Sequence, residues 1–135
     1  MDKKESIGIR NNNPLNIRRS SQKFINEQKS DNDFKKFSSV VYGVRAAIRI
    51  IHTYYFNYRY NTIEKIISRW APPMENSTKD YIDIVSKRSH ILPNVIVIYT
   101  KDNILSIIKA MAYVESHVEL SKEILEEAWK LAQDL

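Results

Sequence analysis

The spacing of apolar residues changes near residue 41 and divides the chain into two stretches. Residues 1–40 are polar and rich in asparagine. Within them, "LNIRR" and "FKKFSS" are typical of two short strands around the irregular segment "SSQKFINEQKSDND". From Val41 onward, apolar residues recur every three or four positions, which is the helical period. The pattern predicts a mainly α (α+β) fold with a small N-terminal β-hairpin or extended element.

Five helices are expected in the second stretch. They are "VYGVRAAIRIIHTYYF", "NTIEKIISRW", a helix that begins near Ser77, "ILSIIKAMAYVESH" and, after Ser121, "KEILEEAWKLAQ". Residues at helical spacing on one side of each are expected to face the core. These are Val44, Ala47, Ile48, Ile51, Tyr55, Tyr81, Ile84, Val85, Ile104, Ile108, Met111, Ile124, Leu125, Ala128, Trp129 and Leu131.

Several helix ends are also readable. Asn61 or Thr62 is the expected N-cap of the second helix, and the pair Pro72–Pro73 ends it, because proline cannot donate to the helical ladder. "STKD" has the form of a capping box, and Asp102 or Asn103 is the expected cap of the fourth helix. The run "VIVIY" fits either a buried strand or an extended loop packed on the core.

The composition limits the chemistry. With 135 residues the chain fits one domain over 1–135, in which 1–40 supplies the extended element and a substrate-cleft loop, and 41–135 the helical core. There is no cysteine, and the three histidines lie far apart, so no metal and no cofactor is expected. No apolar run reaches membrane-spanning length. The charged N-terminus does not resemble a secretory signal, which predicts synthesis in the bacterial cytoplasm.

Charge is distributed unevenly along the chain. The net charge is +5, and residues 1–60 carry 12 Lys/Arg against 5 Asp/Glu. Residues 61–135 carry 9 Lys/Arg against 11 Asp/Glu. A basic N-terminal half indicates an anionic partner, for which nucleic acid, a membrane surface and an acidic cell-wall polymer all fit. Ordinary solubilising surface charge fits equally well.

One glutamate stands where the fourth helix should be apolar. Ile104, Ile108 and Met111 form a stripe whose next member is Glu115. Burial and the negative end of the helix dipole both disfavour the charged carboxylate, so we expect a raised pKa for Glu115. A protonated glutamic acid is what glycosidic cleavage needs, because the leaving oxygen must receive a proton. Alternatively, Glu115 turns to solvent where the helix frays.

Glu75 is in the opposite setting. It precedes a predicted helix N-terminus, where unpaired N–H groups favour an anion, so its pKa should be lowered or unchanged. Two carboxylates whose surroundings separate their pKa values form a candidate acid–base pair. Without that role, Glu75 only decorates a helix end and Trp70 is an ordinary core residue.

Three motifs in order resemble one protein family. They are "GIRNNNPLNIR" (Gly8 to Arg18), "YGVRA" (Tyr42 to Ala46, preceded by "FKKF") and "TIEKIISRWAPPMENSTKDYI" (Thr62 to Ile82). Together they resemble short phage and prophage proteins of the lysozyme-like superfamily, related to lytic transglycosylases and glucosaminidases. Members are often labelled virion structural proteins and are thought to be muralytic. The helix end "AMAYVES" is similar to the end that carries the general acid there.

The resemblance implies a lysozyme-like fold and cleavage of peptidoglycan glycan strands. Glu115 would be the general acid and Glu75 the second carboxylate. The implied substrate-binding residues are Asn12, Asn13, Pro14, Asn16, Arg18, Trp70, Asn76, Thr78 and Tyr81. In other superfamily members an asparagine-containing segment follows the glutamate helix, whereas "NNPLNIR" precedes it here. This order fits a circularly permuted arrangement in which the two regions meet in space.

Two other functions stay open. A catalytically inactive cell-wall-binding or virion structural protein of the same fold is the main alternative, because "Glu115-Ser116-His117" departs from the family pattern. Its partners would be peptidoglycan glycan strands and other virion components, and either protein would act at the cell wall or in a phage particle. Nucleic-acid binding rests on the basic half alone, and no reader motif supports a specific nucleic-acid partner.

Overall fold

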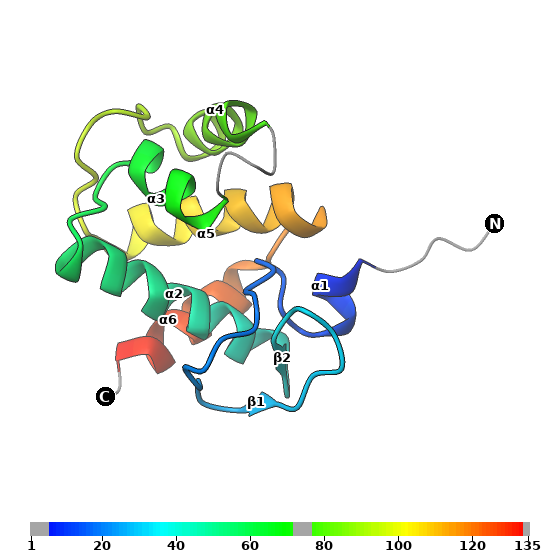
Figure 1. Cartoon of the computed structure of the whole chain (residues 1–135). Coiled ribbons are helices and arrows are strands. Elements are labelled where there is room, and N and C mark those ends of the chain that lie inside the picture. Colours follow the sequence, from blue (N-terminus) through cyan, green and yellow to red (C-terminus); the bar gives the residue numbers. More distant parts are fainter. Residues whose placement is uncertain (1–5, 72–76, 134–135) are drawn as a thin grey trace.

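The architecture places one helix between two pairs of helices. The computed structural model describes residues 6–71 and 77–133. Helix α5 (Lys101–Ser116) lies between α3 and α4 on one side and α2 and α6 on the other (Figure 1). The outer helices span Val40–Asn57 (α2), Ile63–Trp70 (α3), Thr78–Ser89 (α4) and Lys122–Gln133 (α6). The described part of the chain is thus mainly helical, as the apolar pattern predicts.

The core forms around α5 because this helix is apolar on several sides. Seven of its apolar side chains are buried, and they pack with residues from every neighbouring helix and with Leu15 and Phe37 of the N-terminal stretch. Burial of one such side chain contributes about 1.5–3 kcal/mol, so this cluster dominates the stability of the fold. The predicted inward face is wrong at Ile84, which is 36% exposed. Only the narrow stripe of Tyr81, Val85 and Ser89 on α4 is buried.

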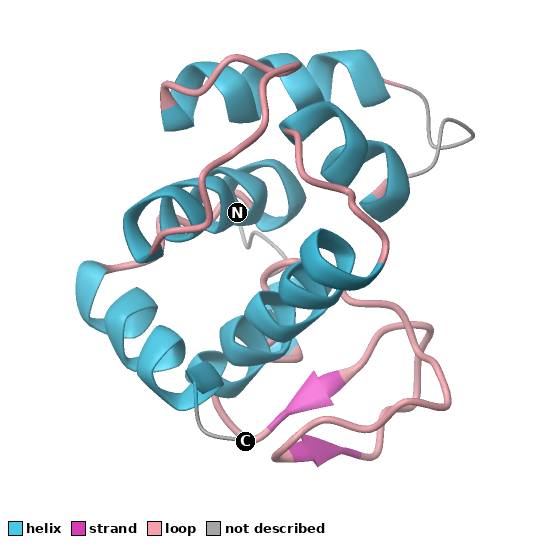
Figure 2. Ribbon diagram, turned by 90° about the vertical axis from the view of Figure 1, so that its left-hand side faces the viewer, coloured by secondary structure: helices cyan, strands magenta, loops and turns pink. Residues whose placement is uncertain are grey.

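The N-terminal stretch contains less strand than its pattern suggests. It begins with a short helix, α1 (Ile7–Arg10), where an extended element is predicted. Strands β1 (Glu27–Gln28) and β2 (Lys36–Phe37) pair antiparallel, with Glu27 opposite Phe37, in the small hairpin seen beside the helices in Figure 2. The predicted small β-element therefore exists.

Its first strand, however, lies elsewhere in the chain. "LNIRR" contributes only a single bridge, between Arg18 and Phe34, and β1 comes from the segment predicted to be irregular. Two turns explain this difference: Asn12 and Asn16 both have φ of 53°, which prevents a continuous extended strand there. The Asn13 side chain also accepts a hydrogen bond from the Ile17 N–H. In a regular strand, this N–H would bond to the neighbouring strand.

A buried ion pair holds the hairpin loop. The Lys35 Nζ lies 3.0 Å from the Glu27 carboxylate, and their side chains are only 1% and 7% exposed. The same ammonium donates to the carbonyls of Gln22 and Ser20. A buried charge needs such partners, so the loop 20–27 is fixed by the lysine that follows it.

The helix caps follow the predicted positions in part. Thr62 caps α3 by accepting from the Lys65 N–H at 3.1 Å. The predicted cap of α5 is wrong by two to three residues, because Thr100 accepts from the Asn103 N–H. The predicted capping box at Ser77 is wrong as well. Ser77 has φ of 55° and makes no side-chain cap, since this left-handed backbone does not present its hydroxyl as an ordinary N-cap does.

The run "VIVIY" is an extended loop and not a strand. Its Val97 is 2% exposed, and its N–H donates to the Asn61 carbonyl at 2.8 Å. The flanking Ile96 and Ile98 are 66% and 71% exposed. Hence one side chain of the run anchors it to the core while its neighbours face outward.

Candidate functional site

Glu115 is the centre of a cluster formed by three distant parts of the chain. It lies in the last turn of α5, half-buried, at the end of the buried stripe of Ile104, Ile108 and Met111. The Tyr81 hydroxyl of α4 donates to its Oε2 at 2.9 Å. The Asn16 Nδ2 donates to its Oε1 at 3.1 Å and to its backbone carbonyl at 3.2 Å. Each carboxylate oxygen is therefore held by a different donor, and the side chain has a fixed orientation.

The two donors affect the charge of Glu115. Hydrogen bonds from a hydroxyl and an amide favour the ionised carboxylate, whereas partial burial and the C-terminal end of α5 favour the neutral acid. The protonation of Glu115 thus depends on its contacts with Tyr81 and Asn16 as well as on its position at the end of the helix. The raised pKa predicted from the sequence stays a prediction.

The environment of Tyr81 shows the effect of this carboxylate. The ring is 7% exposed, and burial raises the pKa of Tyr81 well above the usual value of tyrosine. The charge of Glu115 and the hydrogen bond to it raise this pKa further, because a phenolate beside a carboxylate would be repelled. Tyr81 therefore remains a donor throughout the physiological pH range.

The asparagine segment contacts the end of α5 and Trp70 through the Asn16 side chain and two backbone carbonyls. Asn16 has a left-handed backbone, which turns its side chain toward the end of α5. The Ser116 hydroxyl donates to the Pro14 carbonyl at 2.8 Å, across 102 positions of the chain. Trp70, at the end of α3, donates from Nε1 to the Leu15 carbonyl at 3.1 Å. The segment predicted to meet the glutamate helix does so.

Two of the predicted binding asparagines point elsewhere. Asn13 is fully buried, and its amide binds the carbonyls of Ile17 and Lys35. Asn12 donates to the Phe37 carbonyl at 3.0 Å. Both side chains therefore hold the N-terminal stretch together, and the pattern "NNN" alone does not separate these roles from that of Asn16.

The remaining predicted residues lie at different distances from this cluster. Thr78 donates to the Ala71 carbonyl and joins α4 to the end of α3, one turn before Tyr81. Arg18 is exposed, with its guanidinium 5.1 Å from the centre of the Phe34 ring. Glu75 and Asn76 lie outside the described residues, so the second carboxylate and its neighbour stay predictions.

Gly8 is the residue of the site that sequence reasoning missed. A Cβ atom there would lie 2.2 Å from the Ser116 Oγ and 2.8 Å from the Asn16 Oδ1. That Asn16 oxygen is buried and has no hydrogen-bond partner among the residues that the structure describes. The only signal in the sequence is the presence of two glycines in the whole chain, each inside a recognised motif.

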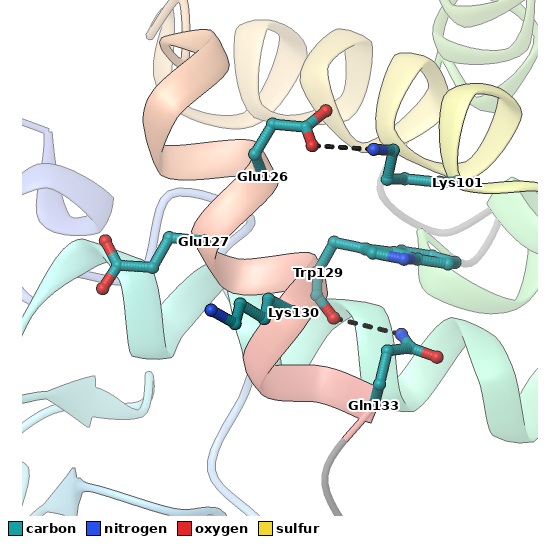
Figure 3. Close-up of a pocket in the computed structure, with 6 residues that line it drawn as sticks. All are labelled: Lys101, Glu126, Glu127, Trp129, Lys130 and Gln133. Atoms are coloured by element: carbon teal, nitrogen blue, oxygen red, sulfur yellow. Dashed lines mark hydrogen bonds and ion pairs between the residues drawn. The ribbon is translucent and has the colours of Figure 1, made fainter.

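Three further observations on the described structure concern metal binding, membrane spanning and a pocket on α6. In residues 6–71 and 77–133, no group of three or more His, Cys, Asp or Glu side chains suits a metal ion. No helix in these ranges is long and apolar enough to cross a membrane. A shallow pocket beside α6 is lined by Trp129 and by charged residues, of which Lys101 and Glu126 pair at 2.8 Å (Figure 3).

Comparison with known proteins gives a phage relative. The chain is 44% identical to Protein P5 of Pseudoalteromonas phage PM2 over 92 residues, which are 64% of this chain and 58% of Protein P5. It thus spans somewhat more than half the length of this curated relative. No family model matches the chain. The relation to a phage protein is confirmed, and the lysozyme-like resemblance, with its permuted order, stays a prediction.

Proposed function

We propose that this protein cleaves the glycan strand of peptidoglycan during a phage life cycle, with Glu115 as the general acid. Two observations carry the proposal: the half-buried place of Glu115 at the C-terminal end of α5, which favours the protonated acid, and the orientation of its carboxyl by Tyr81 and Asn16. Positioning a proton donor against the leaving oxygen is a large part of its catalytic effect. The two donors hold different oxygens of this carboxyl and so orient the group.

The other residues of the site position Glu115 or support the segment beside it in this proposal. Tyr81 and Asn16 position Glu115, and Ser116 fixes the Pro14 carbonyl beside them. Trp70 supports the same segment from α3. Glu75, which lies outside the described residues, keeps its predicted role of stabilising the oxocarbenium-like transition state or positioning water.

Release of soluble muropeptides from purified sacculi tests the proposal. The wild-type protein should release them, and Glu115→Gln should reduce the rate by about 100-fold or more, which is the usual contribution of a general acid. Glu123→Gln is the matched control, because Glu123 is an exposed carboxylate on α6 and is not one of the hydrogen-bond partners described for the cluster. Equal release by wild type and Glu115→Gln would remove Glu115 from the mechanism.

A second function is a non-enzymatic component of a phage particle. Similarity to Protein P5 of a phage favours it, and the contacts of Glu115 with Tyr81 and Asn16 also suit a structural junction between α4, α5 and the N-terminal stretch. In that case the wild-type protein sediments with sacculi or with particles and releases nothing. Glu115→Gln then lowers the unfolding temperature and changes no activity.

A further inference from the structure

A basic, aromatic pocket lies where the chain passes from α2 to α3. Tyr58, Arg59 and Tyr60 line it from the connecting segment, and Lys65, Ser68 and Arg69 line it from α3. The rings of Tyr58 and Tyr60 stack at 5.7 Å with 19° between their planes. Tyr58 is 61% exposed, so the ring pair presents a face to solvent. We call these six residues the tyrosine–arginine surface.

The charges of this surface are of one sign. Arg59, Lys65 and Arg69 are exposed, and no carboxylate within residues 6–71 and 77–133 lines the pocket. Among the residues that the structure describes, none of these three cations forms an ion pair. Arg69 lies 5.8 Å from the centre of the Tyr54 ring. Three cations without an ion-pair partner among the described residues, beside two stacked rings, suit an anionic ligand with a flat, partly apolar face.

A row of aromatic rings joins this surface to the Glu115 cluster. Tyr60 meets Tyr54 edge-on at 5.7 Å, and Tyr54 meets Trp70 at 6.1 Å. Trp70 then binds the Leu15 carbonyl, next to the Asn16 that holds Glu115. Packed, partly buried rings therefore connect the tyrosine–arginine surface to the segment that carries Asn16.

We propose that the tyrosine–arginine surface binds a distal part of the same acidic glycan strand, an inference that rests on the proposed function. Sugar faces would stack on Tyr58 and Tyr60, and carboxylates of the peptide stems would meet Arg59, Lys65 and Arg69. We choose the glycan because the row of rings leads to the segment that holds Glu115, the proposed general acid. Single-stranded nucleic acid would also suit cations beside exposed rings, so it is the competing occupant in the test.

Cosedimentation with purified sacculi tests the surface apart from catalysis. All variants carry Glu115→Gln, so that binding is read without cleavage. Adding Lys65→Gln with Arg69→Gln should weaken binding about tenfold, and adding Tyr58→Ala a further few-fold. The control pair Lys109→Gln with Lys122→Gln removes the same charge from exposed positions on α5 and α6 and should leave binding unchanged.

Three outcomes decide the matter. Loss of sacculus binding that is confined to the surface variants supports the proposal. If the wild-type protein binds in this way but releases no muropeptides, only the cleavage mechanism fails. Equal binding by surface and control variants overturns it. Tight, salt-sensitive binding of single-stranded DNA at this surface, without binding of sacculi, overturns it in favour of nucleic acid.

Discussion

At the residue scale, Glu115 shows how far a helical period can identify a site. Its place at the end of an apolar stripe follows from spacing along one helix, and the structure puts it there, half-buried. Its two donors come from positions 34 and 99 residues away, so no local pattern specifies them. The family resemblance implies that Asn16 and Tyr81 bind a substrate, and the structure shows both oriented toward the carboxylate.

Tyr81 gives a prediction about alkaline pH. Its pKa is raised in the folded protein, whereas in the unfolded chain it is near 10. Unfolding therefore releases a proton above pH 10, and the stability present below that pH is lost as pH rises toward the folded pKa. Tyr81→Phe should remove this part of the loss, up to about 1.4 kcal/mol per pH unit.

Urea unfolding of both proteins at pH 8, 10 and 11 measures the difference. The Phe variant will be less stable at pH 8 by about 1 kcal/mol, because it lacks one hydrogen bond. Its stability should then fall less steeply than that of wild type. Burial also raises the pKa of Tyr99, to about 12, and the pKa of Tyr54. Both tyrosines are present in the wild type and the variant, so their effect on stability cancels in the comparison. Parallel curves would contradict the assignment.

At the element scale, the hairpin depends on charge more than on strand pairing. Its strands have two residues each, and an isolated hairpin of this size is not stable in water. The buried ion pair of Lys35 and Glu27 provides the stabilisation that the short strands lack. The sequence shows both residues as ordinary surface charges, because burial of a lysine is a property of the folded loop around it.

The hairpin pair can be compared with an exposed pair in the same protein. Glu27→Gln leaves the Lys35 ammonium buried without a charged partner and should cost about 3–5 kcal/mol. Asp83→Asn breaks the pair of Lys79 and Asp83, whose side chains are 87% and 47% exposed, and should cost under about 0.5 kcal/mol. Chemical denaturation reads both values, and equal costs would show that the buried pair contributes no more than a surface one.

At the scale of the whole molecule, the N-terminal stretch docks on the helices through close backbone contact. Gly43 lies in α2, and a Cβ atom there would meet the Asn12 carbonyl oxygen at 2.0 Å. Arg45 and Arg49, on the same helix, donate to the carbonyls of Leu131 and Ala132 near the end of α6. Hence α2 joins the first and last parts of the described chain.

Gly43→Ala tests this docking, because it should lower the stability of the protein, whereas glycine-to-alanine changes inside helices usually raise it. In an exposed helix interior, alanine is about 1 kcal/mol more favourable than glycine. Here the clash is with backbone, which cannot rotate away, so we expect a net loss of about 1–3 kcal/mol. Ser68→Ala, at an exposed position of α3, should be neutral or slightly stabilising by thermal unfolding. A stabilised Gly43→Ala would contradict the close contact.

The sequence by itself determined the helical class, most helix boundaries and the position of Glu115, because each depends on spacing within about twenty residues. Only the tertiary structure decided the partners of that carboxylate, the burial of Lys35 and the inward roles of Asn12 and Asn13. It also decided that "VIVIY" is a loop anchored by Val97. These features depend on contacts between residues far apart in the chain, and such contacts form only when the helices pack around α5.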